Sequence, residues 1–422
     1  MPSYASDPNY DESKVPEYTL PDSLVMRNGE RVHSSEMWTQ KRRPEILHLF
    51  REEMFGKTPK YQQNTMDSEI VEMKENTLNG KAHRLQIRLY PIKNNHSFPI
   101  TILAYIPQNT SEKVPAFFAL NFKGNQAVTT DNEVIPSISM GYDPKFKGKP
   151  QEEILRELTE HRGETASRWP IEMILDRGYA FVTACYYDID PDFNDGFQNG
   201  VHPDFYVPGQ TQPAPDEWGS IAAWAWGLSR ILDYFEGAEK GEGELTHRID
   251  PQKVAVFGHS RLGKAALWAG ASEERFVLVI SNNSGCGGAA LSKRAFGETV
   301  GRINTAFPHW FCENFKKYNE NESALPFDQH ELIALIAPRP VYIASALEDQ
   351  WADPKGEFLA AQYASPVYEL LGTDGFAGTA EMPEPNHPVG GTIHYHIRTG
   401  KHDVTPYDWR QYLDFADKYL KP

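Results

Sequence analysis

Residues 253–260 read KVAVFGHS, and residues 262–271 read LGKAALWAGA. The first stretch is short, apolar and rich in valine, which is typical of a buried strand, and the second has the composition of a helix. Gly258 and Gly263 bound a turn between them, and that turn carries Ser260. The sequence therefore predicts a strand that passes into a helix through a tight, glycine-bounded turn.

Strands and helices are predicted to alternate on both sides of this turn. Such alternation indicates a mainly parallel sheet covered by helices on both faces, a three-layer αβα sandwich whose chemistry lies at the carboxyl ends of the strands. Residues 1–95 are polar and interrupted by prolines, and we expect them to pack as an N-terminal segment on a catalytic domain at 96–422, forming one structural unit. The predicted strands are 83–91, 101–107, 115–122, 179–187, 253–260, 276–281, 340–346 and 394–398, and the predicted helices are 36–54, 217–236, 262–271, 329–336, 355–371 and 407–420.

Composition excludes several classes of function. A chain of 422 residues that is 40% hydrophobic and 12% aromatic can bury a sizeable core, and its net charge of −16 argues against a nucleic-acid partner. No apolar run approaches the roughly 18 residues of a membrane helix, so no membrane partner is expected. His394 and His396 share one face of a predicted strand without an evident third ligand, and no metal is predicted. The cysteines are too few for a disulfide framework and match no zinc spacing; they are Cys185, Cys286 and Cys312.

The turn at 258–264 fits two motifs. One is the phosphate-binding loop, G-x-x-x-x-G-K-[ST], and the other is the nucleophile elbow of α/β-hydrolases. The phosphate loop needs Ser or Thr after the lysine to hold magnesium, but Ala265 stands there, and the neighbouring strand runs into Ser281 and Asn282 instead of an acidic residue. A nucleotide-binding protein is therefore the remote alternative.

The nucleophile elbow fits better, although its second glycine comes one place late. Gly258 and Ser260 occupy their expected positions, while Leu262 stands where the motif has glycine and Gly263 follows. The alternative is an ordinary strand-to-helix turn whose serine caps the helix.

A serine hydroxyl becomes a nucleophile only when a base removes its proton and an acid orients that base. In α/β-hydrolases these groups follow the serine in the order acid, then histidine. The strand at 340–346 runs into Glu348 and Asp349, and His402 lies in the loop after the last strand. The sequence thus predicts Ser260 as nucleophile and His402 as general base.

The motif Ser-Arg-Leu-Gly-Lys at 260–264 resembles the Gly-Cys-Ser-Arg-x-Gly-Lys signature of glucuronoyl esterases, carbohydrate esterase family 15. The resemblance extends from about residue 100 to the end of the chain. It implies an α/β-hydrolase that cleaves esters between 4-O-methyl-glucuronic acid on xylan and alcohols, notably lignin alcohols, without metal or cofactor. Three further blocks carry it: SGCGGAA (284–290), LPFDQHELIALIAPRPVYI (325–343) and DQWADPKGEF (349–358).

The resemblance also implies roles for four residues. Arg261 would supply its backbone N–H and guanidinium to the oxyanion. Lys264 and Glu298 would bind sugar hydroxyls, and Trp351 would offer its indole to the uronate ring. The structural alternatives are a helix-surface lysine, a helix-terminal carboxylate and a core tryptophan.

The sequence departs from the family at the acid. Many members have a Glu shortly after the elbow helix, where this chain has Asn283, and an amide cannot carry the charge that stabilises an imidazolium. We therefore predict Asp349 as the triad acid, with Glu348 and Asp353 as the alternatives.

Two further expectations complete the prediction. His259 and Asp403 stand where many fungal members have cysteines, so no disulfide should link these positions. Residues 1–18 lack the charged and apolar regions of a signal peptide, so we expect a secreted or periplasmic protein whose leader is absent from this chain, or else a cytoplasmic one. The predicted activity is serine carboxylic-ester hydrolysis of glucuronoyl esters; another carbohydrate esterase, such as an acetylxylan esterase, is the alternative.

Overall fold

The computed structural model describes residues 7–61, 66–92, 99–110, 112–238, 245–378 and 380–421, and the structural statements below refer to these. The chain divides into two compact units. The first comprises Met1–Thr58, Ala214–Ala222 and Phe257–Asp403, and the second comprises Pro59–Pro213, Ala223–Val256 and Val404–Pro422. Every candidate site residue, from Ser260 to His402, belongs to the first unit.

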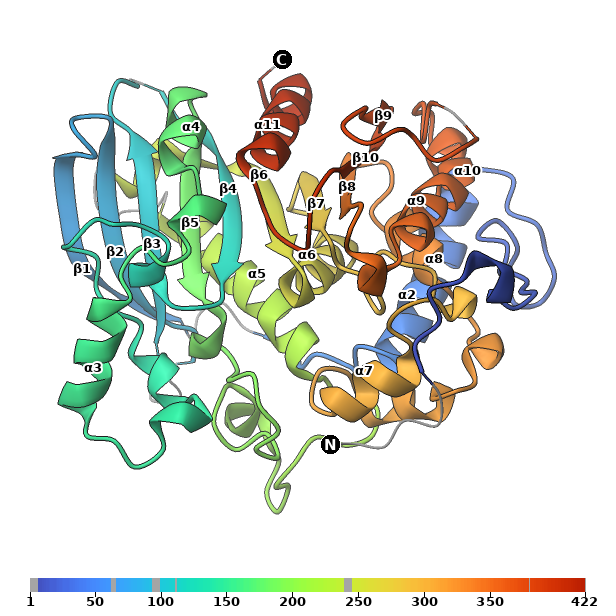
Figure 1. Ribbon diagram of the computed structural model, residues 1–422, viewed down its shortest axis with the longest axis horizontal. Coiled ribbons are helices and arrows are strands. Elements are labelled where there is room, and N and C mark those ends of the chain that lie inside the picture. Colours follow the sequence, from blue (N-terminus) through green and yellow to red (C-terminus); the bar gives the residue numbers. More distant parts are fainter. Residues whose placement is uncertain are drawn as a thin grey trace. The chain divides into compact units, whose positions relative to one another are not determined.

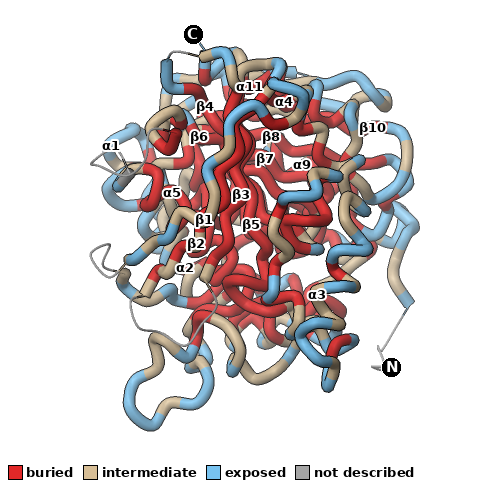
Figure 2. The backbone as a smooth tube through the Cα atoms, turned by 90° about the vertical axis from the view of Figure 1, so that its left-hand side faces the viewer, coloured by how far each residue is buried: buried red, intermediate tan, exposed pale blue. Residues whose placement is uncertain are grey.

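The strands of the second unit follow the order β1-β2-β3-β5-β4-β6. β4 and β5 are parallel, whereas β1, β2, β3 and β5 pair antiparallel in succession. β3 and β5 are buried along their whole length (Figure 2), and all but one residue of each, Thr101 and Thr183, are apolar. The bounds are β1 Asp67–Thr77, β2 Ala82–Tyr90, β3 Ile100–Pro107, β4 Val114–Asn121, β5 Ala180–Cys185 and β6 Ile249–His259, of which Phe257–His259 belong to the first unit.

Two helices cover opposite faces of β4. Phe117 packs its ring 5.5 Å from that of Trp409 in α11 (Pro406–Leu420), and Phe118 packs 5.5 Å from Phe235 in α5 (Ser220–Ala238). Successive side chains of a strand point to opposite faces, so α11 and α5 lie on either side of the sheet. The predicted three-layer αβα architecture with a mainly parallel central sheet is confirmed.

The first unit carries the order β7-β8-β10-β9 (Figure 1). β7 (Leu278–Asn282), β8 (Val341–Ala346) and β10 (Ile393–Arg398) are parallel, and β9 (Val389–Gly390) is antiparallel to β10. Their carboxyl ends lead into the loops that carry Asn283, Asp349 and His402, which is where a parallel sheet places its functional groups.

The remaining predicted helices are present with one correction, and three further helices were not predicted: α3 (Gln151–Glu160), α4 (Ile171–Asp176) and α7 (Val300–Ala306). The helix predicted at 355–371 is two helices that meet at Ala364, because Pro366 near the start of the second lacks an N–H and cannot continue the first. The bounds are α1 Ser35–Met37, α2 Arg43–Glu53, α3 Gln151–Glu160, α4 Ile171–Asp176, α6 Arg261–Ser272, α7 Val300–Ala306, α8 Gln329–Ala334, α9 Pro354–Tyr363 and α10 Ser365–Leu370, with a five-residue π-helical segment at Trp38–Arg42.

The predicted boundary near residue 95 stays a prediction. β2 lies before that boundary and pairs with β3 after it.

No helix in the described ranges combines the length and the apolar character that crossing a bilayer requires.

Candidate active site

Ser260 lies on a strained turn between β6 and α6 (Figure 1). Its backbone has φ 57° and ψ −128°, a conformation that residues other than glycine rarely adopt. A β-carbon at Gly258 would lie 1.9 Å from the Leu262 carbonyl oxygen, and one at Gly263 would lie 3.0 Å from the Ser284 β-carbon. The late glycine therefore serves the close packing of the elbow, and the predicted strand–turn–helix arrangement is confirmed.

His402 and Asp349 are hydrogen-bonded to each other. The His402 Nδ1 lies 2.6 Å from the Asp349 Oδ2, and the Asn283 side chain donates to the same oxygen at 2.9 Å. Burial raises the pKa of Asp349, but the bonds from His402 and Asn283 outweigh it and hold that pKa below its ordinary value. An ionised Asp349 fixes the proton of His402 on Nδ1 and leaves Nε2 free to accept one.

His402 also lies beside the serine turn. Its ring is 4.6 Å from that of His259, the residue before Ser260, and the Nδ1 of His259 lies 2.6 Å from the Asn282 side-chain oxygen. These contacts link the ends of β6 and β7 to the loop after β10, and the His402 side chain is 41% exposed.

The two alternative acids have other surroundings. Glu348 is exposed to solvent. Asp353 accepts a bond from the Arg294 guanidinium at 2.8 Å and another from the Gly356 N–H at 2.9 Å, which caps α9. Of the three candidate carboxylates, Asp349 is the one that contacts His402.

Arg261 is the first residue of α6, directly after Ser260. Its guanidinium lies over the rings of Trp310 and Phe307, 4.8 and 5.5 Å from their centroids, and those rings stack on each other at 3.7 Å. Cation–π contacts orient the guanidinium. A positive group at a helix N-terminus beside the serine suits an oxyanion.

Lys264, Glu298 and Trp351 are also brought together. The Lys264 ammonium is buried and donates to the Ser284 carbonyl oxygen at 2.5 Å, and burial lowers its pKa, which the Glu298 charge opposes. Burial raises the pKa of Glu298, opposed by Lys264 and by a hydrogen bond from the Trp351 side chain. The Glu298 N–H also donates to the Trp351 carbonyl oxygen at 3.0 Å, while Trp351 is 39% exposed.

Known esterases resemble this chain in sequence and in structure. The family model "Glucuronyl esterase, fungi" matches residues 172–372. Carbohydrate esterase MZ0003, from an unknown prokaryotic organism, is 49% identical over 412 residues, 98% of this chain and 92% of that protein. A glucuronoyl esterase structure from Solibacter usitatus is 45% identical, with 96% of this chain and 99% of that one covered and a TM-score of 0.88. The 4-O-methyl-glucuronoyl methylesterase 1 of Wolfiporia cocos is 37% identical over 175 residues, 40% of this chain and 41% of that protein.

The chain belongs to the glucuronoyl esterase family. It is accordingly a carboxylic-ester hydrolase with the α/β-hydrolase fold, as the resemblance implied.

Sequence reasoning missed one buried carboxylate in this esterase. Glu357 of α9 accepts bonds from the Gly285 N–H at 2.9 Å, the Ser284 hydroxyl at 3.3 Å and the Ser345 hydroxyl at 2.5 Å. Burial raises the pKa of Glu357 to about 8. Glu357 thus holds the turn whose Ser284 carbonyl binds Lys264, and its membership of the DQWADPKGEF block was the only signal in the sequence.

The histidine pair of β10 is engaged within the esterase. His396 Nδ1 lies 2.9 Å from the Tyr342 hydroxyl, and the rings of His394 and Tyr342 are 5.0 Å apart. Among the described residues, no group of three or more His, Cys, Asp or Glu side chains could hold a metal ion. The three cysteines are buried and unpaired.

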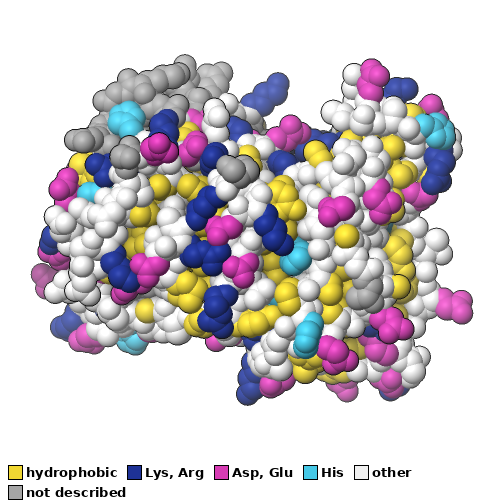
Figure 3. All heavy atoms as spheres, turned by 90° about the horizontal axis from the view of Figure 1, so that it is seen from above, with side chains coloured by type: hydrophobic (Ala, Val, Ile, Leu, Met, Phe, Trp, Pro, Cys, Tyr) yellow, Lys and Arg dark blue, Asp and Glu magenta, His cyan; other side chains and the backbone are white. Residues whose placement is uncertain are grey.

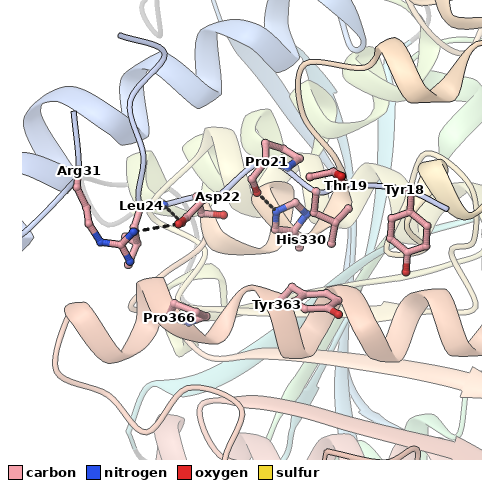
Figure 4. Close-up of a pocket in the computed structure, with 11 residues that line it drawn as sticks. Tyr18, Thr19, Pro21, Asp22, Leu24, Arg31, His330, Tyr363 and Pro366 are labelled. Atoms are coloured by element: carbon pink, nitrogen blue, oxygen red, sulfur yellow. Dashed lines mark hydrogen bonds and ion pairs between the residues drawn. The ribbon is translucent and has the colours of Figure 1, made fainter. Parts of the chain in front are cut away.

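The esterase also has a hollow of about 540 Å³ away from these residues (Figure 4). The N-terminal segment forms one side of it and Tyr363 and Pro366 the other, with His330 between them. None of the candidate catalytic residues lines this hollow.

Proposed function

We propose that this enzyme hydrolyses esters of glucuronic and 4-O-methyl-glucuronic acid, as in lignin–xylan cross-links, through a Ser260–His402–Asp349 triad and an acyl-enzyme. The observation that carries the proposal is the 2.6 Å contact between His402 and Asp349 in the loops beside the strained Ser260 turn. A hydroxyl, a carboxylate and an imidazole are the groups that acyl transfer requires, and they follow one another here in the α/β-hydrolase order Ser260, Asp349, His402.

The reaction follows from these positions. The Ser260 hydroxyl attacks the ester carbonyl while His402 Nε2 takes its proton, and His402 then gives that proton to the departing alcohol. A water molecule then attacks the glucuronoyl–Ser260 ester while His402 takes its proton. His402 returns that proton to the Ser260 oxygen, and the free uronate is released. Asp349 stabilises the imidazolium formed in both halves, and Arg261 offers its N–H and positive charge to the tetrahedral oxyanion, a donor worth about 10²–10³ in rate.

Selectivity for the uronate is assigned to Lys264, Glu298 and Trp351. An ammonium and a carboxylate side by side can donate to and accept from neighbouring sugar hydroxyls, and the exposed Trp351 indole suits a pyranose face. No cofactor and no metal is required by this mechanism.

The proposed partner is a carbohydrate ester. We expect the enzyme to encounter it outside the cytoplasm, as a secreted or periplasmic protein. On the face shown in Figure 3, Lys and Arg side chains are interspersed with Asp and Glu side chains. Nucleic-acid binding relies on an excess of basic residues, so the net charge of −16 supports a partner of another kind.

Initial rates on methyl glucuronate, methyl galacturonate and acetylated xylose, measured side by side, test the proposal. We expect methyl glucuronate to have the highest kcat/KM, by about tenfold or more. A preference for acetylated xylose would instead favour an acetylxylan esterase on the same fold.

A further inference from the structure

The N-terminal segment is bonded directly to the loop that carries Glu298. The Asn9 carbonyl accepts the Gly297 N–H at 2.8 Å. Gly297 has a φ of 62°, and a β-carbon there would lie 2.5 Å from the Trp351 carbonyl oxygen. Gly297 is therefore enclosed by Asn9 and Trp351, immediately before Glu298.

Ion pairs through Glu12 anchor the same segment. The Glu12 carboxylate binds Arg294 at 2.6 Å and Lys355 at 2.9 Å, and Arg294 in turn binds Asp353 at 2.8 Å. Farther along, the Pro21 carbonyl lies 2.9 Å from the ring of His330 (Figure 4). These bonds fix the segment within the first unit.

Tyr10 belongs to this segment and is half-exposed. Its ring meets Phe296 edge-on, with centroids 6.2 Å apart, yet 52% of the residue is exposed. Partial burial raises the pKa of Tyr10; Arg302 opposes this, and the charges of Asp349 and Glu298 add to it. The charges of the proposed triad acid and of the proposed sugar-binding carboxylate therefore both act on the Tyr10 hydroxyl.

We propose that Tyr10 is a specificity-determining residue, whose exposed ring packs against the pyranose ring of the uronate on the side of Glu298 and Trp351. Aromatic faces bind the C–H faces of sugars while their polar edges reach hydroxyls. The contact is to the carbohydrate and not to the alcohol, because Tyr10 adjoins the loop of Glu298. The inference rests on the proposed glucuronoyl esterase activity and adds a residue to that site.

Steady-state kinetics of Tyr10→Ala, Tyr10→Phe and Tyr363→Ala test this, with methyl glucuronate, benzyl glucuronate and 4-nitrophenyl acetate as substrates. Tyr10→Ala should raise KM about fivefold or more for both glucuronates with little change in kcat, and this loss should exceed the loss for the acetate. Tyr10→Phe should recover most of that loss, because it restores the ring. Tyr363, another exposed tyrosine of the same unit, is the matched control and should behave as wild type.

Other outcomes overturn the inference. An unchanged KM in Tyr10→Ala, in an enzyme that does hydrolyse methyl glucuronate, refutes the contact while leaving the proposed function intact. A loss confined to the benzyl ester would assign the ring to the alcohol, and an equal loss on all three substrates with a lowered melting temperature would make Tyr10 structural. A wild-type enzyme inactive on both glucuronates would refute the proposed function together with the inference.

Discussion

Replacement of Asp349 by asparagine isolates the contribution of its charge. Both His402 and Asn283 donate to the same oxygen, Oδ2, at 2.6 and 2.9 Å. In Asp349→Asn, the Asn283 amide should keep the carbonyl oxygen of the new residue at this position. His402 would then keep its proton on Nδ1, and only the negative charge would be lost.

The size of the loss in kcat follows from the separation between the two charge centres, the imidazolium and the carboxylate. Two unit charges about 4 Å apart interact by about 4 kcal/mol at an effective dielectric constant of about 20. That constant suits this pair because His402 is 41% exposed to water while Asp349 is only 6% exposed. A barrier raised by about 4 kcal/mol slows kcat roughly 10³-fold.

Steady-state kinetics on methyl glucuronate measure this loss, and Asn283 supplies a second variant. Asn283→Ala alone should cost less than about tenfold, since the carboxylate remains. In the double variant the amide at 349 is free to flip and donate to His402, which forces the wrong tautomer, so its loss should exceed the product of the single losses. Glu348→Gln is the matched control, an exposed carboxylate next in sequence, and should keep wild-type kcat.

Two results would refute the reasoning. A kcat of Asp349→Asn within tenfold of wild type would mean that the charge of Asp349 does not stabilise the imidazolium. Strictly additive losses in the double variant would mean that Asn283 does not orient residue 349.

Four further predictions concern the same site. Ser260→Ala should abolish ester hydrolysis and leave the melting temperature nearly unchanged; residual activity above a few per cent would exclude Ser260 as the nucleophile. Alanine at Lys264, Glu298 or Trp351 should reduce kcat/KM for glucuronoyl esters by about tenfold more than for a small acetyl ester, and equal losses would assign them to structure. The pKa of Glu357, raised to about 8 from 4.5, means that the folded state holds an extra proton between these values, so stability falls as pH rises through this window; thermal melts of Glu357→Gln should show a smaller fall than wild type. EDTA should leave activity unchanged, and reversible inactivation would contradict a metal-free mechanism.

Local sequence patterns were sufficient for the serine turn. Gly258 and Gly263 are needed because neighbouring backbone and Ser284 leave almost no room for a β-carbon, and glycine is visible in a sequence. Topology indicated the loop of His402 and the acidic loop after β8, since parallel strands bring the loops after their carboxyl ends to one edge. β1 was missed because it is a polar edge strand without an apolar pattern, and the break at Ala364 because a proline near a helix start is compatible with one helix or two.

Contacts between distant residues could not be predicted in this way. The sequence revealed that Asn283 lacks a charge, but not that its amide donates to the carboxylate of Asp349, 66 positions later. Likewise nothing in residues 1–95 indicated that Asn9 bonds Gly297 and that Tyr10 packs on Phe296.

The sequence by itself determined the α/β-hydrolase class, the strained serine turn and the loops that carry the histidine and the acid. These depend on hydrophobic periodicity, glycine positions and the order of strands, all of which are local or topological. Only the tertiary structure decided which carboxylate contacts His402, what supports that carboxylate and which remote segment bonds the loop before Glu298. Hydrogen bonds of 2.6 to 2.9 Å between loops depend on the conformation of every residue in those loops, and periodicity carries no information about that conformation.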